Sequence, residues 1–205
     1  MLDISLYLIA DPNQTQGRDI LEIIREAVAG GVTAVQLRAA NLSDPEYSAL
    51  ALRISAILIG TSVKFFLNDR PHLLELVGAH GVHIGEGKST LSEAREIIGA
   101  EHYLGASAIA LEDIDVEIDY LSVGPVWATR SKADAGPAIG VDETARRVKE
   151  SPWPMLAIGG ITAENVLELN GSGIAGIGVL GEICRAADPR AVASALKTAT
   201  MQLAR

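Results

Sequence analysis

The chain has 205 residues, of which 48% are hydrophobic and 4% aromatic, and its formal net charge is −9 at pH 7. This length can bury one sizeable core, so we expect a single domain over residues 1–205. The acidic balance argues against nucleic acid as a partner, because a phosphate backbone is bound by a basic face. An acidic chain that binds a small anion must do so through a local cluster of cations and backbone amides.

The sequence has one cysteine, Cys184, so no internal disulfide can form, which fits a reducing compartment. No cationic leader precedes the first apolar run, and no apolar stretch approaches the ~18 residues that a membrane helix needs. We therefore expect a cytoplasmic protein with no membrane partner.

Eight short apolar runs recur along the chain at fairly regular intervals. They span residues 6–10, 34–38, 64–68, 81–84, 103–107, 120–126, 155–160 and 174–180. Most are apolar at consecutive positions, as in parallel strands that are covered on both faces.

Stretches with helical periodicity lie between these runs. Residues 19–31 carry one apolar stripe that ends at Gly30-Gly31, and Ser43-Asp44-Pro45 begins the next helix with a cap residue and an early proline. Further helices are expected at 71–77, 90–98, 141–150, 163–169 and 189–203, with a weaker pattern over 111–118.

Strand-like runs that alternate with helices predict a single (β/α)8 TIM barrel. The alternative is an open, doubly wound sheet, but no G-x-G-x-x-G follows the first run. In a barrel of this kind the active site forms at the carboxyl ends of the strands. Polar residues just after each apolar run are therefore the candidate site residues.

The second run ends in Gln36-Leu37-Arg38. Successive strand residues point to opposite faces, so Gln36 and Arg38 are expected to point into the barrel while Leu37 faces the helices. An inward arginine needs an anion beside it. The sequence leaves open whether that anion is a ligand or a carboxylate of the barrel.

Polar residues also end the next three runs. After the third, Asn68 can bond a ligand and Asp69 can hold a divalent cation, although an Asx turn would explain both. His83 in the fourth run is expected to be a satisfied barrel histidine. Ser107 follows Gly105 and Ala106, which are small enough for a ligand to approach closely; the alternative is that packing alone requires small residues there.

The sixth run leads into a loop that carries Thr129, Ser131 and Lys132. Two hydroxyls and a cation within four residues can each donate a hydrogen bond to a phosphate oxygen. The alternative is a solvated surface loop.

The last two runs end in glycines, at Gly159-Gly160 and around Gly176–Gly181. Glycine-bearing loops at consecutive strand ends are typical of a barrel phosphate site, where backbone N–H groups bind the anion. Conformational demand at a strand–helix turn would select glycine as well.

Taken together, these segments resemble the thiamine phosphate synthase and thiazole tautomerase superfamily over nearly the whole chain. The similar segments are 6-LYLIAD-11, 30-GGVTAVQLR-38, 68-ND-69, 78-GAHGVHIG-85, 104-LGAS-107, 124-GPVWATRSK-132, 157-AIGGIT-162 and the glycine-rich eighth run. The order and spacing of these segments, rather than any one of them, make the resemblance specific.

The resemblance implies a transferase that condenses hydroxymethylpyrimidine diphosphate with thiazole phosphate to give thiamine phosphate and diphosphate. It implies that Asp69 holds Mg²⁺ and that Arg38, Lys132 and Ser107 are the catalytic residues. It assigns two sets of substrate contacts: Gln36, Arg38, Asn68, Ser107 and Lys132 to the pyrimidine diphosphate, and Thr129, Ser131, Gly160, Leu180 and Gly181 to the thiazole phosphate.

The chain departs from the family pattern at two charged positions. Ala40 stands where the family has a lysine, and Lys88 stands where it has a second magnesium carboxylate. Loss of an anionic ligand should weaken Mg²⁺ binding. Two compensations are open: Glu86 reaches the metal, or Lys88 itself neutralises the diphosphate.

Two other functions stay open from the sequence. One is a tautomerase-like isomerase, although Ile109 stands where the resemblance would place its catalytic histidine. The other is a catalytically weak barrel that only binds a phosphorylated ligand. A homodimer is implied by family analogy alone.

Overall fold

The computed structural model describes residues 2–85, 90–107, 113–131 and 135–203. Within these residues, eight parallel strands pair in chain order and close into one barrel, with β1 paired to β8. The strands are β1 (Leu6–Ala10), β2 (Ala34–Leu37), β3 (Lys64–Asn68), β4 (Gly81–Ile84), β5 (Tyr103–Ser107), β6 (Tyr120–Val123), β7 (Met155–Ile158) and β8 (Gly176–Val179). The predicted (β/α)8 barrel is confirmed, and the open sheet is wrong.

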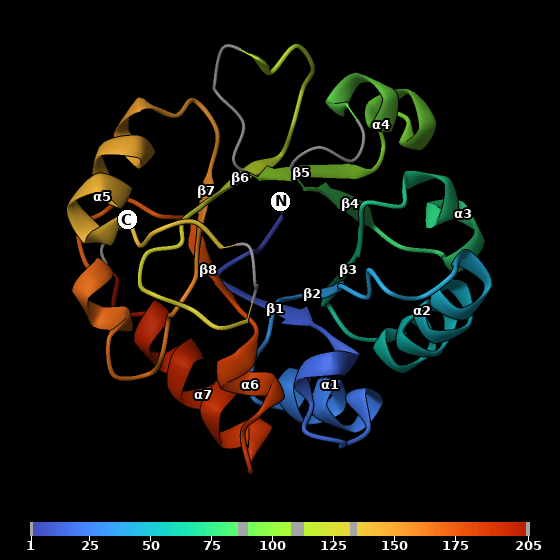
Figure 1. Cartoon of the computed structure of the whole chain (residues 1–205), viewed down its shortest axis with the longest axis horizontal. Helices are drawn as coiled ribbons and strands as arrows, with labels where there is room; N and C mark the ends of the chain where they lie inside the picture. The colour runs from blue at the N-terminus through green and yellow to red at the C-terminus, as the bar shows by residue number, and fades with distance from the viewer. Residues whose placement is uncertain (1, 86–89, 108–112, 132–134, 204–205) are drawn as a thin grey trace.

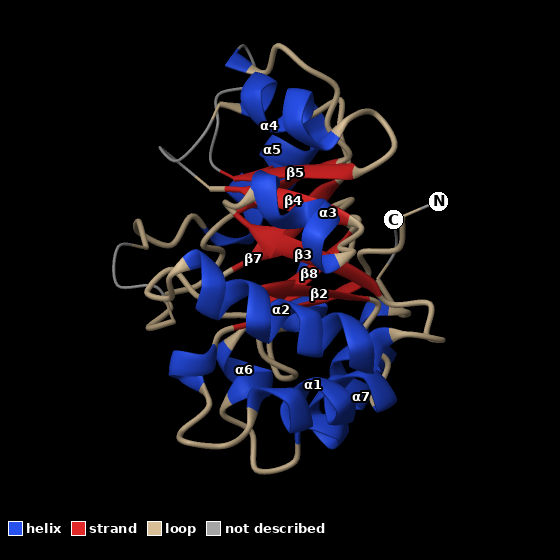
Figure 2. Cartoon of the chain, turned by 90° about the vertical axis from the view of Figure 1, so that its right-hand side faces the viewer, coloured by secondary structure: helices blue, strands red, loops and turns tan. Residues whose placement is uncertain are grey.

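Helices surround the strands on the outside of the barrel (Figures 1 and 2). The α-helices are α1 (Ile20–Ala29), α2 (Asp44–Leu58), α3 (Leu74–Val77), α4 (Leu91–Ile98), α5 (Gly140–Glu150), α6 (Gly181–Cys184) and α7 (Pro189–Thr200). Within the described ranges, short 3-10 helices accompany them: η1 (Pro12–Gln14), η2 (Pro71–Leu73) and η4 (Val166–Leu169). Among the described residues, no helix has the length and apolarity to cross a membrane.

The helix starts follow the cap residues of the sequence. Ser43 and Glu46 form a capping box at the start of α2, and the carboxylate of Asp19 accepts a hydrogen bond from the Leu21 N–H at the start of α1. Each side chain satisfies backbone N–H groups that have no partner within the helix.

Two helix predictions need correction. The helix expected over 163–169 is only the 3-10 helix η4, because the side chains of Thr162 and Asn165 bond the local backbone instead of leaving it to an α-helix. Residues 114–118 are not helical, and residues 111 and 112 lie outside the described ranges.

Alternation along the strands divides the core into two parts. Side chains that point outward pack against the helices in one large cluster, which includes Leu37. Side chains that point inward form a second cluster, which fills the barrel: Ile4, Tyr7, Ala34, Phe66, Tyr120 and Leu156. At the level of these side chains the interior is therefore a packed core.

Tyr120 is the centre of the inward cluster. Its ring lies edge-on to Phe66 with centroids 5.8 Å apart, and it stacks on His83 at 5.5 Å. Gly105 of the neighbouring strand makes room for it, since a Cβ at that position would lie 2.2 Å from Cζ of Tyr120. The glycine is thus required by the ring beside it.

We predict that Gly105→Ala destabilises the fold by about 1–3 kcal/mol, the usual cost of overpacking a core. The added methyl group must displace the buried Tyr120 ring. Urea denaturation followed by circular dichroism measures the change.

Gly136→Ala is the matched control, because a Cβ at Gly136 would meet no atom within 4 Å. It should leave the midpoint unchanged or slightly raised. Equal stability of the Gly105→Ala variant and the wild type would contradict the packing described for Tyr120.

Candidate active site

A cavity of about 1220 Å³ opens at the carboxyl ends of the strands. Every predicted site residue within the described ranges lines it: Gln36, Arg38, Asn68, Asp69, Ser107, Thr129, Ser131, Gly160, Leu180 and Gly181. Lys132 and Glu86 lie outside the described residues, as do Lys88 and Ile109. Polar residues at the carboxyl ends of the strands therefore lie around one cavity, as expected for this barrel.

Arg38 is held by a carboxylate of the first strand's end. Its Nη1 lies 2.7 Å from Oδ2 of Asp11, whose side chain is only 4% exposed. The other oxygen of Asp11 accepts hydrogen bonds from the backbone and side-chain nitrogens of Asn13. The ion pair fixes one edge of the guanidinium, and the remaining N–H groups of Arg38 make no hydrogen bond to any described residue.

Asp69 adopts a left-handed backbone conformation, with φ of 55°. Its Oδ1 accepts a 2.6 Å hydrogen bond from the Gly85 N–H, and its other oxygen accepts one from the side-chain amide of Asn68. No side chain caps helix η2, so an Asx turn does not account for this pair. Strained residues of this kind cluster at functional sites, and Asp69 lines the cavity.

A line of hydrogen-bonded polar side chains crosses the inside of the barrel. Its members, in order, are Gln36, Tyr7, Tyr120, His83, Ser107 and Ser122. We call this set the interior chain. All of its members except Tyr120 line the cavity, so the chain follows the inner end of the cavity from Gln36 to Ser122.

His83 is the satisfied barrel histidine that the sequence predicts. Its Nδ1 lies 3.0 Å from the Tyr120 hydroxyl and its Nε2 lies 2.6 Å from Oγ of Ser107. Burial lowers the pKa of His83 to about 4, so the ring is neutral at pH 7. Burial also raises the pKa of Tyr7 and of Tyr120 above the ordinary phenol value, so both stay protonated.

The loop after β6 lies against the ends of β7 and β8. A Cβ on Gly160, whose φ is 68°, would lie 2.7 Å from Cβ of Trp127, and one on Gly181 would lie 2.8 Å from Oγ of Ser131. The Ser131 N–H in turn donates to the Thr129 hydroxyl at 3.2 Å. Glycine at both positions therefore lets three strand ends approach one another around a small polar cradle.

Asp11 and Arg185 contact predicted site residues but are absent from the sequence prediction. Asp11 directly follows the first strand, so the rule that polar residues after strands are candidate site residues could have identified it. Arg185 lies one helical turn after Gly181 and donates to Oγ of Ser131 at 3.3 Å and to the side-chain oxygen of Gln14. It adds a cation beside the polar cradle.

The described residues contain no group of three or more His, Cys, Asp or Glu that could hold a metal ion. Asp69 is one carboxylate at the cavity wall. Mg²⁺ is commonly bound by one or two carboxylates together with substrate phosphates and water. A single aspartate thus fits a magnesium ion that arrives with a diphosphate.

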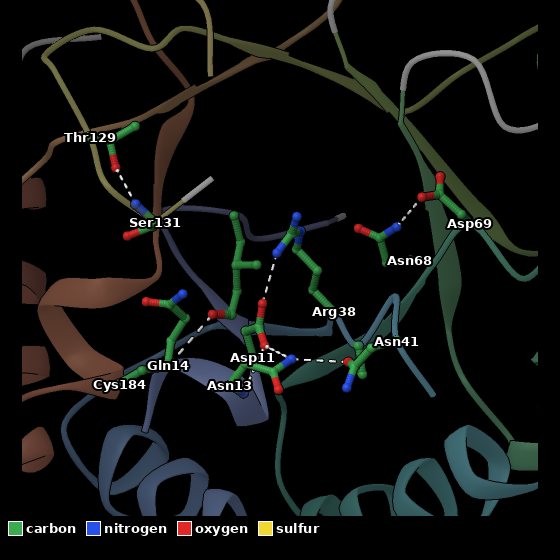
Figure 3. Close-up of polar contacts among 12 residues, drawn as sticks. Asp11, Asn13, Gln14, Arg38, Asn41, Asn68, Asp69, Thr129, Ser131 and Cys184 are labelled. Carbon is green, nitrogen blue, oxygen red and sulfur yellow. Dashed lines mark hydrogen bonds and ion pairs between the residues drawn. The ribbon is translucent and has the colours of Figure 1, made fainter. Parts of the chain in front are cut away.

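The polar side chains of the predicted site fall into two sets. Figure 3 shows Thr129 and Ser131 on one side of the cavity and Asn68 and Asp69 on the other, with Arg38 between them. The hydroxyls with Arg185 on the first side and the Asn68 amide on the second, with Arg38 between them, suit two negatively charged groups held next to each other.

A model of the thiamine monophosphate synthase family matches residues 6–183. A thiamine-phosphate synthase of Azorhizobium caulinodans is 40% identical over 205 residues, which cover 96% of this chain and 94% of that protein. One of Xanthobacter autotrophicus is 35% identical over 204 residues, covering 97% of this chain and 96% of the relative. Among solved structures, a thiamine phosphate pyrophosphorylase from Pyrococcus furiosus superposes with a TM-score of 0.86 at 29% identity, covering 98% and 97% of the two chains.

We predict that Arg38→Gln weakens binding of inorganic diphosphate by about tenfold or more, since a hydrogen bond to a charged group contributes about 1.5–3 kcal/mol. Isothermal titration calorimetry measures the affinity, and urea denaturation measures stability in parallel. Arg190→Gln, on the exposed start of α7, removes the same charge and should leave the affinity unchanged. Unchanged affinity with lowered stability in Arg38→Gln would mean that Arg38 only pairs with Asp11.

Proposed function

The chain belongs to the thiamine monophosphate synthase family, and we propose that it catalyses the transfer for which its relatives are named. It is a transferase of thiamine biosynthesis. In the proposed reaction it joins hydroxymethylpyrimidine diphosphate to thiazole phosphate, forming thiamine phosphate and releasing diphosphate. The observation that carries the proposal is one cavity lined by two sets of anion-binding groups.

The proposed diphosphate side is formed by Arg38 and Asn68, with Lys132 as a further cation. Arg38 offers its unpaired guanidinium edge, and the ion pair with Asp11 holds it in place. These groups would neutralise the negative charge that grows on the leaving diphosphate. Asp69 would hold a magnesium ion, which would supply further charge neutralisation to the diphosphate. Glu86 is proposed as a second ligand.

The proposed thiazole phosphate side is formed by Thr129, Ser131, Gly160 and the backbone at Leu180-Gly181. Two hydroxyls and the N–H groups at the start of α6 supply donors, and the glycines leave room for the phosphate. This side fixes the thiazole so that its ring nitrogen faces the pyrimidine.

The bond changes balance without a proton transfer. The bond between the pyrimidine methylene carbon and the diphosphate oxygen breaks, and its electron pair leaves with the diphosphate. The thiazole nitrogen lone pair then forms the new carbon–nitrogen bond. The pyrimidine amino group stabilises the intervening cation, so the protein acts by positioning, charge neutralisation and exclusion of water.

The absence of an acid–base step agrees with the cavity. Two buried titratable rings of the described residues line the cavity: burial lowers the pKa of His83 to about 4 and raises that of Tyr7 above the ordinary phenol value, so neither changes its protonation near pH 7. The comparisons give no support to an isomerase of the tautomerase type or to a barrel that only binds its ligand. A homodimer stays a prediction.

Incubation of the protein with both substrates and Mg²⁺ should yield thiamine phosphate and diphosphate in equal amounts. Chromatography of the first product and a coupled assay of the second measure the reaction. If neither product forms while the protein still binds thiazole phosphate, the proposed transfer is wrong.

The two sides of the cavity can be separated in the same assay. Ser131→Ala should raise the KM for thiazole phosphate about tenfold and leave the KM for the pyrimidine diphosphate nearly unchanged, because one hydrogen bond to a charged group is lost. Ser194→Ala, on the exposed face of α7, is the matched control and should alter neither value. A rise confined to the pyrimidine KM would reverse the assignment of the two sides.

A further inference from the structure

The interior chain has no part in the charge neutralisation described above. Five consecutive hydrogen bonds of 2.6–3.0 Å link its members, and they come from five different strands of the barrel. Five of its six side chains are less than 9% exposed, and Ser107 is half-buried. A buried polar line of this length is costly unless every group is satisfied, so it calls for a reason.

The chain has a direction that follows from donor counting. The Nε2 of Gln36 can only donate, so the Tyr7 oxygen accepts. A buried hydroxyl proton needs an acceptor, and the only other partner of the Tyr7 hydroxyl among the described residues is Tyr120, so Tyr7 donates to Tyr120. Tyr120 in turn must give its proton to Nδ1 of His83.

The direction continues through the imidazole. A neutral ring that accepts at Nδ1 carries its one proton on Nε2, so His83 donates to Oγ of Ser107. In the last hydrogen bond, between Ser107 and Ser122, either hydroxyl can donate. From Gln36 to Ser107, each member donates to the next one.

This direction determines what Gln36 shows to the cavity. With Nε2 committed to Tyr7, the side-chain oxygen of Gln36 makes no hydrogen bond among the described residues. Within those residues, no side-chain nitrogen or oxygen is buried without a partner. The oxygen therefore has accessible surface, and Gln36 lines the cavity, so it presents a hydrogen-bond acceptor there.

We propose that the interior chain sets substrate specificity: Tyr7, Tyr120 and His83 are positioning residues that hold the Gln36 amide with its oxygen toward the pyrimidine. This inference rests on the proposed function. A pyrimidine amino group donates to that oxygen, whereas a pyrimidine with an oxo group at the same position places two acceptors against each other. Sites built to bond one polar group reject analogues that lack it, because buried groups are then left unpaired.

The test compares the affinities of two pyrimidine methyl diphosphates, one with an amino group and one with an oxo group at the same ring position. Calorimetry in the presence of Mg²⁺ measures both, with inorganic diphosphate as a third ligand. The wild type should prefer the amino compound by about a hundredfold or more. Tyr7→Phe and Tyr120→Phe should each reduce this preference about tenfold or more, because Gln36 is then free to turn, and should leave diphosphate affinity unchanged.

Tyr103→Phe is the matched control. Tyr103 is a half-buried member of the same aromatic cluster, 6.2 Å from Phe66, and takes no part in the interior chain. It should keep the wild-type preference. An unchanged preference in folded Tyr7→Phe and Tyr120→Phe overturns the proposal, and so does a loss of diphosphate affinity as large as the loss of preference.

The direction itself is visible by nitrogen-15 NMR of labelled histidine. The proposal requires the Nε2–H form of His83 in the wild type, with Nδ1 shifted as an acceptor, and loss of that acceptor shift in Tyr120→Phe. An Nδ1–H form in the wild type would reverse the chain and overturn the proposal.

These outcomes separate the inference from the proposed function. If the wild type binds the amino compound selectively, the variants lose this selectivity and no thiamine phosphate forms, the proposed function is wrong and the inference stands. If thiamine phosphate forms and the variants keep the preference for the amino compound, the inference is wrong and the proposed function stands. If the wild type binds both pyrimidines equally, the inference is wrong whatever the turnover.

Discussion

The packing of the Tyr120 ring inside the barrel is the contact on which the site depends. The ring occupies the space that Gly105 leaves free, lies edge-on to Phe66 and stacks on His83. Its hydroxyl also bonds Tyr7 at 2.9 Å. The Tyr120 side chain thus fills the barrel below the strand ends and also forms hydrogen bonds to two other buried side chains. Because the interior is filled at this level, a ligand can enter only from the rim where the strands end.

The closed barrel then places scattered residues around one cavity. The chain carries a net charge of −9, yet the cavity wall includes Arg38 and Arg185 beside hydroxyls and glycine amides. A low-dielectric wall strengthens the electrostatic attraction between such groups and an anion, relative to the same attraction in water. The proposed binding of two anions by an acidic protein is therefore a local property of the rim. The one acidic residue that pairs with Arg38, Asp11, fixes its orientation and leaves the other guanidinium edge to the cavity.

The alternation of apolar runs with helical stretches was sufficient to predict the barrel, and the polar residues after each run were sufficient to predict much of its rim. Strand alternation placed Gln36 and Arg38 toward the inside, as the lining of the cavity has them. The partners of these side chains could not be predicted, since Asp11 lies 27 residues from Arg38 in sequence and Arg185 lies 54 residues from Ser131. The interior chain could not be predicted from the sequence for a different reason. A tyrosine within an apolar run satisfies the pattern of a buried strand through its ring, and nothing local reveals what its hydroxyl meets 113 residues away.

We propose that one cavity holds two anions on different sides of Arg38. A crystal structure with thiamine phosphate, diphosphate and Mg²⁺ bound tests it most directly. The predicted result is diphosphate against Arg38 and Asn68 and the phosphate of thiamine phosphate against Ser131 and Gly160, with the pyrimidine amino group on the Gln36 oxygen. Both anions on one side of Arg38, or either of them outside the cavity, would contradict the claim.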